Sequence, residues 1–227
     1  MTSIRRMGQR VGERIGVVTR TGMDADLEQA LRQADLLNEC CEKMIVKLKA
    51  HRPRGLSNYE GLGALLQTYA AKFSQSPKFA EILNKAMQLE NHLAVQERDY
   101  TDQVEREIIK ELRSWQLEEY KSLQIQRKEL EKSRLDMDMI ENRLRRGRPQ
   151  HQEQHNLQTK ARRAHQSYTA QEHKLRELLE RVPEWEDTIA ALVLDYNRLQ
   201  RDHFQRAADI MADINGSHSE QGSQDEL

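Results

Sequence analysis

Aromatic residues, prolines and long apolar runs are all scarce in this sequence. Phe, Trp and Tyr together make up 5% of the 227 residues, and there are only four prolines. No run approaches the roughly 18 consecutive apolar residues that a membrane-spanning helix needs. Apolar residues are 37% of the chain, below the roughly 45–50% of an ordinary globular domain. These shortages exclude a large compact core and favour long helices that each bury a narrow apolar stripe.

Cysteine is scarce as well, and the two cysteines, Cys40 and Cys41, are adjacent in a helical pattern. A disulfide between these neighbours would be strained, so we expect two free thiols in a reducing compartment. The N-terminal stretch has scattered arginines and lacks the apolar core of a signal peptide. The sequence therefore predicts a cytoplasmic protein.

The net charge of −1 conceals a strong asymmetry. Residues 1–22 carry a net charge of +4, and residues 143–165 carry +6. The remaining residues therefore carry −11. Two cationic patches on an acidic body predict an anionic partner that is met at defined places.

Apolar residues recur at helical spacing over four stretches of the chain. Asp24 or Thr21 can cap the first helix, and Ser76 followed by Pro77 marks the start of another. Pro183 falls inside the last stretch and predicts a kink there. The predicted helices are residues 23–51, 58–73, 77–146 and 150–214.

The length of the last two helices determines the predicted architecture. Residues 77–146 span about 105 Å as a helix, whereas a compact chain of this size has a radius of gyration of about 17 Å. Two such helices, joined by the turn "RRGRPQ", must lie antiparallel, with the first helix against them. Three thin helices leave apolar surface uncovered, so a partner chain is expected. The predicted class is all-α, an elongated three-helix antiparallel coiled coil.

The first 22 residues form a basic amphipathic segment. On a helical wheel, five apolar residues fall within an arc of roughly 80° and the arginines spread over the other side. Such a helix can lie in a membrane interface, with aliphatic groups in the acyl boundary and guanidinium groups at lipid phosphates. An extra helix packed on the body, or a basic arm without fixed structure, fits the pattern as well. The predicted insertion residues are Ile4, Met7, Val11, Ile15 and Val18, and the predicted headgroup-binding residues are Arg5, Arg6, Arg10 and Arg14.

Two stretches carry a resemblance to a known family. "QLENHLAVQERDYTDQVEREIIKEL" (residues 88–112) and "QIQRKELEKSRLDMDMIENRLRRG" (residues 124–147) resemble the second helix of endophilin, amphiphysin and nadrin-type BAR proteins. In particular, "KSRLDMD" before a basic turn resembles the R-L-D-x-D run that precedes the family's basic tip. With its basic leader, the chain resembles an N-BAR domain. "HRPRGLSNYEG" is too short for the endophilin insert, which favours the nadrin-like or amphiphysin-like side.

The resemblance implies a crescent-shaped six-helix homodimer that binds anionic membranes and senses or generates curvature, as in membrane tubulation during endocytosis. It implies a peripheral location on membranes, a membrane-inserting segment (1–22) and a BAR domain (23–214). Residues 215–227 are expected from their sequence to form a disordered tail. The implied headgroup-binding residues are Arg143, Arg145, Arg146 and Arg148 at the basic tip, Lys160, Arg162 and Arg163 across the turn, and Lys128, Lys132 and Arg134 on the concave face.

Other functions find less support in the sequence. His151 and His155 have the i, i+4 spacing of helical zinc ligands, but Glu153 stands at the wrong position for the metalloprotease motif. We therefore expect no enzyme activity, no metal and no cofactor. The basic patches lack the interleaved aromatics of a nucleic-acid surface, so nucleic acid is not expected either. A dimeric coiled-coil scaffold that binds a protein partner, such as a small GTPase, remains the alternative.

Overall fold

All of the regular secondary structure that the computed structural model describes is helical, which confirms the all-α prediction. The residues that the structure describes are 6, 7, 9, 10, 13, 21–50, 55–73, 75–146 and 151–216.

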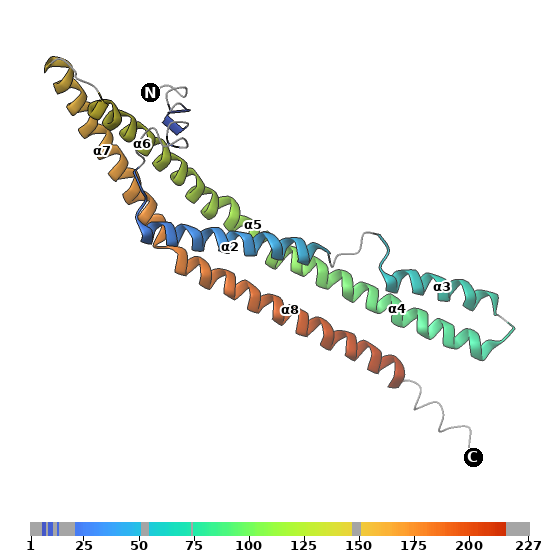
Figure 1. Ribbon diagram of the computed structural model, residues 1–227. Helices are drawn as coiled ribbons and strands as arrows, with labels where there is room; N and C mark the ends of the chain where they lie inside the picture. Colours follow the sequence, from blue (N-terminus) through green and yellow to red (C-terminus); the bar gives the residue numbers. More distant parts are fainter. Residues whose placement is uncertain are drawn as a thin grey trace. The chain divides into compact units, whose positions relative to one another are not determined.

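The helices follow one another with short connections (Figure 1). Two of them, η1 and η2, are π-helical turns inside the predicted helix 77–146. The elements are α2 (Ala25–Ala50), α3 (Asn58–Lys72), α4 (Pro77–Val104), η1 (Glu105–Ile109), α5 (Lys110–Trp115), η2 (Gln116–Tyr120), α6 (Lys121–Arg146), α7 (His151–Leu179) and α8 (Val182–Gly216).

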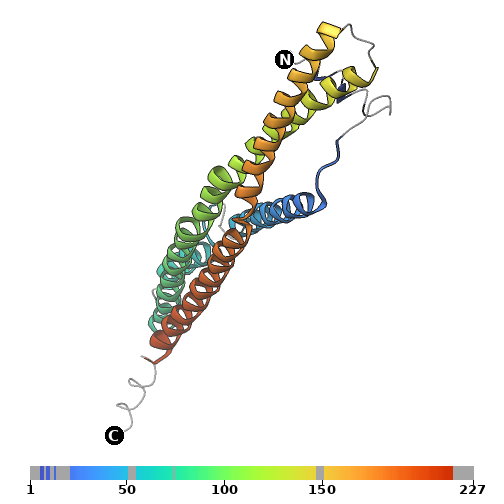
Figure 2. The same cartoon turned by 90° about the vertical axis from the view of Figure 1, so that its left-hand side faces the viewer.

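Residue contacts divide the chain into two units, and the first consists of Met1–Cys40 and Ser114–Asp187. Within it, α6 and α7 lie side by side and antiparallel (Figures 1 and 2). Their register follows from the Arg143–Glu153 ion pair at 2.8 Å, near the end of α6. Trp115 packs edge to face on Trp185 with 5.9 Å between ring centroids. The buried core of this unit includes Leu27, Leu31, Leu123, Leu130, Leu135, Leu175 and Leu179.

Asp24, one of the two caps that the sequence offers, directly precedes α2. Its carbonyl accepts the Glu28 N–H at 3.0 Å, and its carboxylate accepts the Asp26 N–H at 3.3 Å. The carboxylate also bonds Arg176 of α7 at 2.7 Å, and this hydrogen bond holds the pKa of Asp24 below its usual range. A local capping signal therefore also attaches the beginning of α2 to α7.

The second unit consists of Cys41–Arg113 and Thr188–Leu227. Here α3 and α4 form a helical hairpin, and α8 runs beside α4 (Figures 1 and 2). A Cβ atom on Gly63 would lie 2.7 Å from Oδ1 of Asn91, so glycine allows α3 to approach α4 closely. Gln96 of α4 donates to the His203 carbonyl of α8 at 3.3 Å. The core of this unit includes Cys41, Ile45, Leu93, Val104, Ile108, Ile109, Leu112, Ile189 and Leu199.

The predicted helix 77–146 is helical throughout and begins at Pro77, but it contains two π-helical turns. Val104, Ile108 and Leu112 are buried and succeed one another in steps of four. Each such step advances about 40° beyond a full turn of an α-helix. An under-wound turn at η1 takes back part of this rotation and keeps all three residues on the buried side.

The last predicted helix is interrupted where the sequence predicts only a kink. It divides into α7 and α8, with Glu180 and Arg181 between them. Pro183 has no N–H to donate to the carbonyl four residues earlier. The helix α7 therefore ends in turns, and a new helix, α8, begins after them. Pro183 occupies the first turn of α8, where a missing N–H costs little.

Candidate functional site

Four cationic side chains follow one line along α6. Lys121, Lys128, Lys132 and Arg143 stand at positions i, i+7, i+11 and i+22, which fall within an arc of about 60° on an α-helix. All four are exposed. We call these four residues the cationic stripe.

The stripe is available to an anion. Lys121 and Lys128 make no ion pair or side-chain hydrogen bond with another residue that the structure describes. Lys132 donates to Glu129, one turn earlier, and Arg143 pairs with Glu153. Both pairs are exposed, and such pairs contribute between about 0 and 1 kcal/mol. A ligand that carries several phosphates therefore meets cations that are weakly held or unpaired.

Further cations lie near the end of the α6–α7 pair. Arg145 is exposed, with Glu141 at 3.6 Å. Within the described ranges Lys160, Arg162 and Arg163 of α7 are exposed and have no ion-pair partner. The Arg146 side chain and all of Arg148 lie outside the described residues.

Sequence reasoning identified Lys128 and Lys132 but missed Lys121. The signal was present, because Lys121 precedes Lys128 by seven residues and therefore lies on the same face of a helix.

Arg134, predicted on the same surface, is placed elsewhere. Its side chain is 4% exposed, and its guanidinium bonds Glu13 at 2.9 and 3.1 Å, Glu131 at 2.9 and 3.0 Å, and Asp138. Burial by itself lowers the pKa of Arg134, but the hydrogen bonds that it donates to Glu131 and Glu13 raise this pKa above the usual value. Because its donors are already bonded inside the protein, we omit Arg134 from the proposed headgroup-binding residues.

The N-terminal segment is described at five of its first twenty positions. Met7 is 63% exposed. Arg6 bonds Asp136, and Arg10 lies 4.0 Å from Glu131. The other predicted residues of the segment, Ile4, Arg5, Val11, Arg14, Ile15 and Val18, lie outside the described residues.

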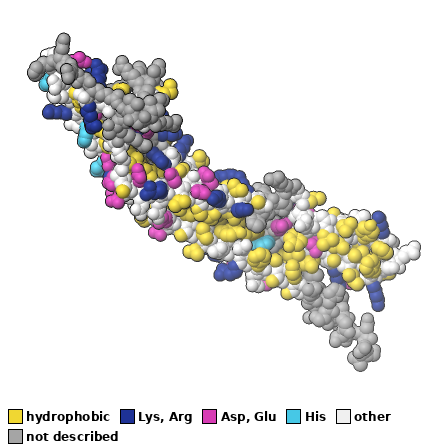
Figure 3. Space-filling model, in the orientation of Figure 1, with side chains coloured by type: hydrophobic (Ala, Val, Ile, Leu, Met, Phe, Trp, Pro, Cys, Tyr) yellow, Lys and Arg dark blue, Asp and Glu magenta, His cyan; other side chains and the backbone are white. Residues whose placement is uncertain are grey.

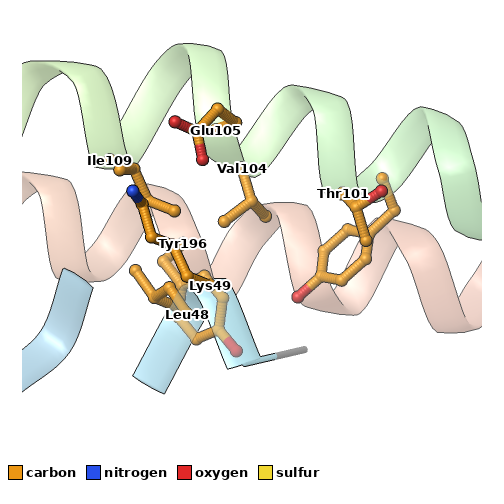
Figure 4. Close-up of a pocket in the computed structure, with 8 residues that line it drawn as sticks. Leu48, Lys49, Thr101, Val104, Glu105, Ile109 and Tyr196 are labelled. Atoms are coloured by element: carbon orange, nitrogen blue, oxygen red, sulfur yellow. The ribbon is translucent and has the colours of Figure 1, made fainter. Parts of the chain in front are cut away.

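The second unit holds cavities of very different size. Figure 4 shows one in the second unit, where Leu48 of α2, Val104 of α4 and Tyr196 of α8 converge. Its volume is about 20 Å³, which is room for one water molecule. A wider groove of about 450 Å³ between α4 and α8 opens to solvent. No group of three potential metal-ligating side chains is found in the part of the chain that the structure describes.

No helix among the described residues is both long enough and apolar enough to span a bilayer.

Comparison with known proteins identifies the family. A family model for the BAR domain matches residues 2–219. No curated protein sequence matches the chain. Because the family model covers nearly the whole sequence, the chain belongs to the BAR domain family. BAR domains are membrane-binding scaffolds rather than enzymes: they dimerise, bind membranes peripherally, and sense or scaffold membrane curvature.

Proposed function

We propose that this chain is an N-BAR-type module that binds anionic membranes as a homodimer and inserts its N-terminal segment, residues 1–22, into one leaflet. The observation that carries the proposal is the cationic stripe. Four exposed cations on one line of a rigid helix can meet several lipid phosphates at once. Each contributes about 1 kcal/mol near an anionic surface, so a chain gains about 4 kcal/mol and a dimer about twice that.

The end of the α6–α7 pair extends the proposed surface. Arg145, Lys160, Arg162 and Arg163 are exposed, and we assign Arg146 and Arg148 to the same group from the sequence. Because exposed charges are screened beyond about 10 Å at 0.1 M salt, binding through these residues should weaken as salt increases.

The proposed insertion rests on the pattern of the N-terminal segment. Ile4, Met7, Val11, Ile15 and Val18 form its apolar arc, and the exposed Met7 side chain is available to lipid. Glycines at positions 8, 12 and 16 each cost about 1 kcal/mol of helix propensity. Membrane contact is therefore what we expect to stabilise the segment as a continuous helix.

The proposed homodimer explains apolar side chains that a single chain leaves uncovered. Figure 3 shows yellow side chains gathered over α3 and α4. Soluble monomers rarely expose apolar patches beyond a few hundred Å². A second copy of the chain is the occupant we propose. The exposed residues of this apolar face are Leu62, Leu65, Tyr69, Phe73, Phe79 and Ile82.

Charge reversal on the stripe tests the proposal by sedimentation with vesicles that contain phosphatidylserine. The variant Lys121→Glu/Lys128→Glu reverses the charge of two lysines that make no ion pair with another residue that the structure describes. We expect about a hundredfold weaker binding or more, because two favourable contacts of about 1 kcal/mol each become repulsive.

The matched control is Lys47→Glu/Lys78→Glu, which makes the same change in net charge at exposed lysines off α6. This control variant is expected to lose much less affinity for the vesicles than Lys121→Glu/Lys128→Glu. Equal losses in the two variants would mean that net charge rather than the stripe determines binding. Absence of sedimentation for the wild type would favour the protein-scaffold alternative.

A further inference from the structure

The run Arg134-Leu135-Asp136-Met137-Asp138 of α6 contacts the N-terminal segment at separate points. Asp136 forms a two-pronged ion pair with Arg6: Nε donates to Oδ1 at 2.9 Å and Nη2 to Oδ2 at 2.7 Å. The side chains are 27% and 23% exposed. The hydrogen bond to Asp136 raises the pKa of Arg6 above its usual value.

Arg134 makes the second contact, and it is buried. Glu13 of the segment accepts two hydrogen bonds from its guanidinium, and the Glu13 side chain is only 9% exposed. Gln9, also buried, donates to Glu13 at 3.0 Å. With Glu131 and Asp138, three carboxylates surround one guanidinium, so the cluster is net negative and attracts the cation of Arg10.

Asp138 makes the third contact, with the residue that leads into α2. The Thr21 backbone N–H donates to Oδ2 at 3.1 Å, and its hydroxyl donates to Oδ1. Asp138 is 2% exposed. The three charged residues of the run therefore each bind a different point between positions 6 and 21.

We propose that residues 134–138 form a docking site for the chain's own N-terminal segment, and that docking holds the segment back from the membrane until anionic lipid competes for its arginines. The proposal rests on the proposed function, because it concerns the regulation of the insertion step. It also assigns a role to a run that family resemblance alone associates with the basic tip.

The geometry makes docking and lipid binding competitive. Asp136 follows Lys121 by 15 residues, which places it about 60° from Lys121 on α6 and beside the cationic stripe. The docked Arg6 therefore lies next to the stripe, whose four residues stay exposed. A lipid phosphate accepts the same two-pronged hydrogen bonds from a guanidinium as a carboxylate does. The Arg6 guanidinium cannot satisfy both acceptors in this way at the same time.

The pairs differ in how easily they can be broken. The Arg6–Asp136 pair is partly exposed and is weakened by salt and by competing anions. The Arg134–Glu13 pair is buried, and its loss leaves Arg134 with Glu131 and Asp138 as remaining partners. We therefore place the first step of release at Arg6 and Arg10 and the later step at Glu13.

Hydrogen exchange of the full chain without lipid tests docking directly. Asp136→Asn removes the partner of Arg6 and changes no residue assigned to lipid binding. We expect the amides of residues 6–13 to exchange about two- to fivefold faster than in the wild type, as the loss of a partly exposed ion pair implies. Glu13→Gln removes the carboxylate on the segment itself and is also expected to make the amides of residues 6–13 exchange faster.

The matched control is Asp187→Asn, which makes the same change in charge at an exposed aspartate of α8. It should leave exchange at residues 6–13 unchanged. With vesicles of phosphatidylcholine and phosphatidylserine, Asp136→Asn should reach half-maximal binding at a lower phosphatidylserine fraction than Asp187→Asn.

Unchanged exchange in Asp136→Asn would overturn the docking site. If Asp136→Asn exchanges faster but binds vesicles at the same phosphatidylserine fraction as Asp187→Asn, the segment docks, but docking does not restrain it from the membrane. That result would overturn the regulatory part of the proposal. If neither the wild type nor Asp136→Asn binds vesicles, the proposed function fails, and the exchange result still decides whether the segment docks.

Discussion

His203 shows how burial controls the behaviour of a single side chain in this protein. Its ring stacks on Tyr100 with 4.3 Å between centroids, and its buried Nδ1 has no hydrogen-bond partner among the described residues. Burial lowers the pKa of His203 below its usual value of 6.5, and Arg206 acts in the same direction while Glu97 opposes it.

The lowered pKa predicts the sign of a pH effect on stability. As the pH falls below about 6.5, the unfolded chain binds a proton at His203 before the folded chain does, so the free energy of unfolding decreases. His203→Phe keeps a ring against Tyr100 and removes the titration. Urea unfolding between pH 5 and 8 should show a shallower loss of stability in this variant than in the wild type.

The same replacement at the exposed His155 controls for the loss of a histidine. If His203→Phe and His155→Phe change the slope of stability against pH equally, burial of His203 is not the cause.

The residue scale also shows what sequence alone cannot supply. Lys128, Lys132 and Arg134 look alike in the sequence, and the first two are exposed in the structure. Arg134 is buried because Glu13, 121 residues away, folds onto it. No local pattern contains that contact. The signal for Lys121, in contrast, was available from its spacing to Lys128.

At the scale of elements, α3 depends on a local cap. The Ser57 hydroxyl accepts the Glu60 N–H at 3.2 Å, and the Glu60 carboxylate accepts the Ser57 N–H at 2.9 Å. This reciprocal arrangement satisfies two N–H groups that the helix itself cannot pair. Ser57 is buried, so water cannot replace the cap easily.

Ser57→Ala should therefore lower the free energy of unfolding by about 1 kcal/mol. Ser122→Ala, at an exposed position inside α6, is the control and should be neutral or slightly stabilising, because alanine has the higher helix propensity. Urea denaturation followed by circular dichroism measures both. Equal effects at the two serines would contradict the capping role.

Helix starts were predictable from sequence, and helix irregularities were predictable only in part. Asp24 and the Ser76-Pro77 pair are local signals, and the helices begin where these signals place them. The sequence predicted only a kink where the structure has an interruption at Glu180 and Arg181. The position of a proline shows where an α-helix is disturbed, but not whether the helix bends or ends there. Val104 and Ile108 belong to a series of buried residues in steps of four, and the structure accommodates this spacing with the π-helical turn η1.

At the scale of the whole molecule, the apolar face of α3 and α4 predicts how the chain self-associates. Leu65→Glu and Phe79→Glu each place a charge on this face and should move the mass measured by light scattering from dimer toward monomer, because an unpaired charge would be buried at the interface. Leu117→Glu, at a similarly exposed leucine of η2, should remain dimeric. Dimers retained by both face variants would place the interface elsewhere.

Electron microscopy of phosphatidylserine-containing vesicles mixed with the intact chain tests the central claim most directly. That claim is that this BAR domain binds and bends anionic membranes through its cationic stripe and its N-terminal segment. The predicted result is that the wild-type chain converts vesicles to narrow tubules, and that Lys121→Glu/Lys128→Glu leaves them spherical. Spherical vesicles with the wild type, at concentrations where the protein is dimeric, would contradict the account.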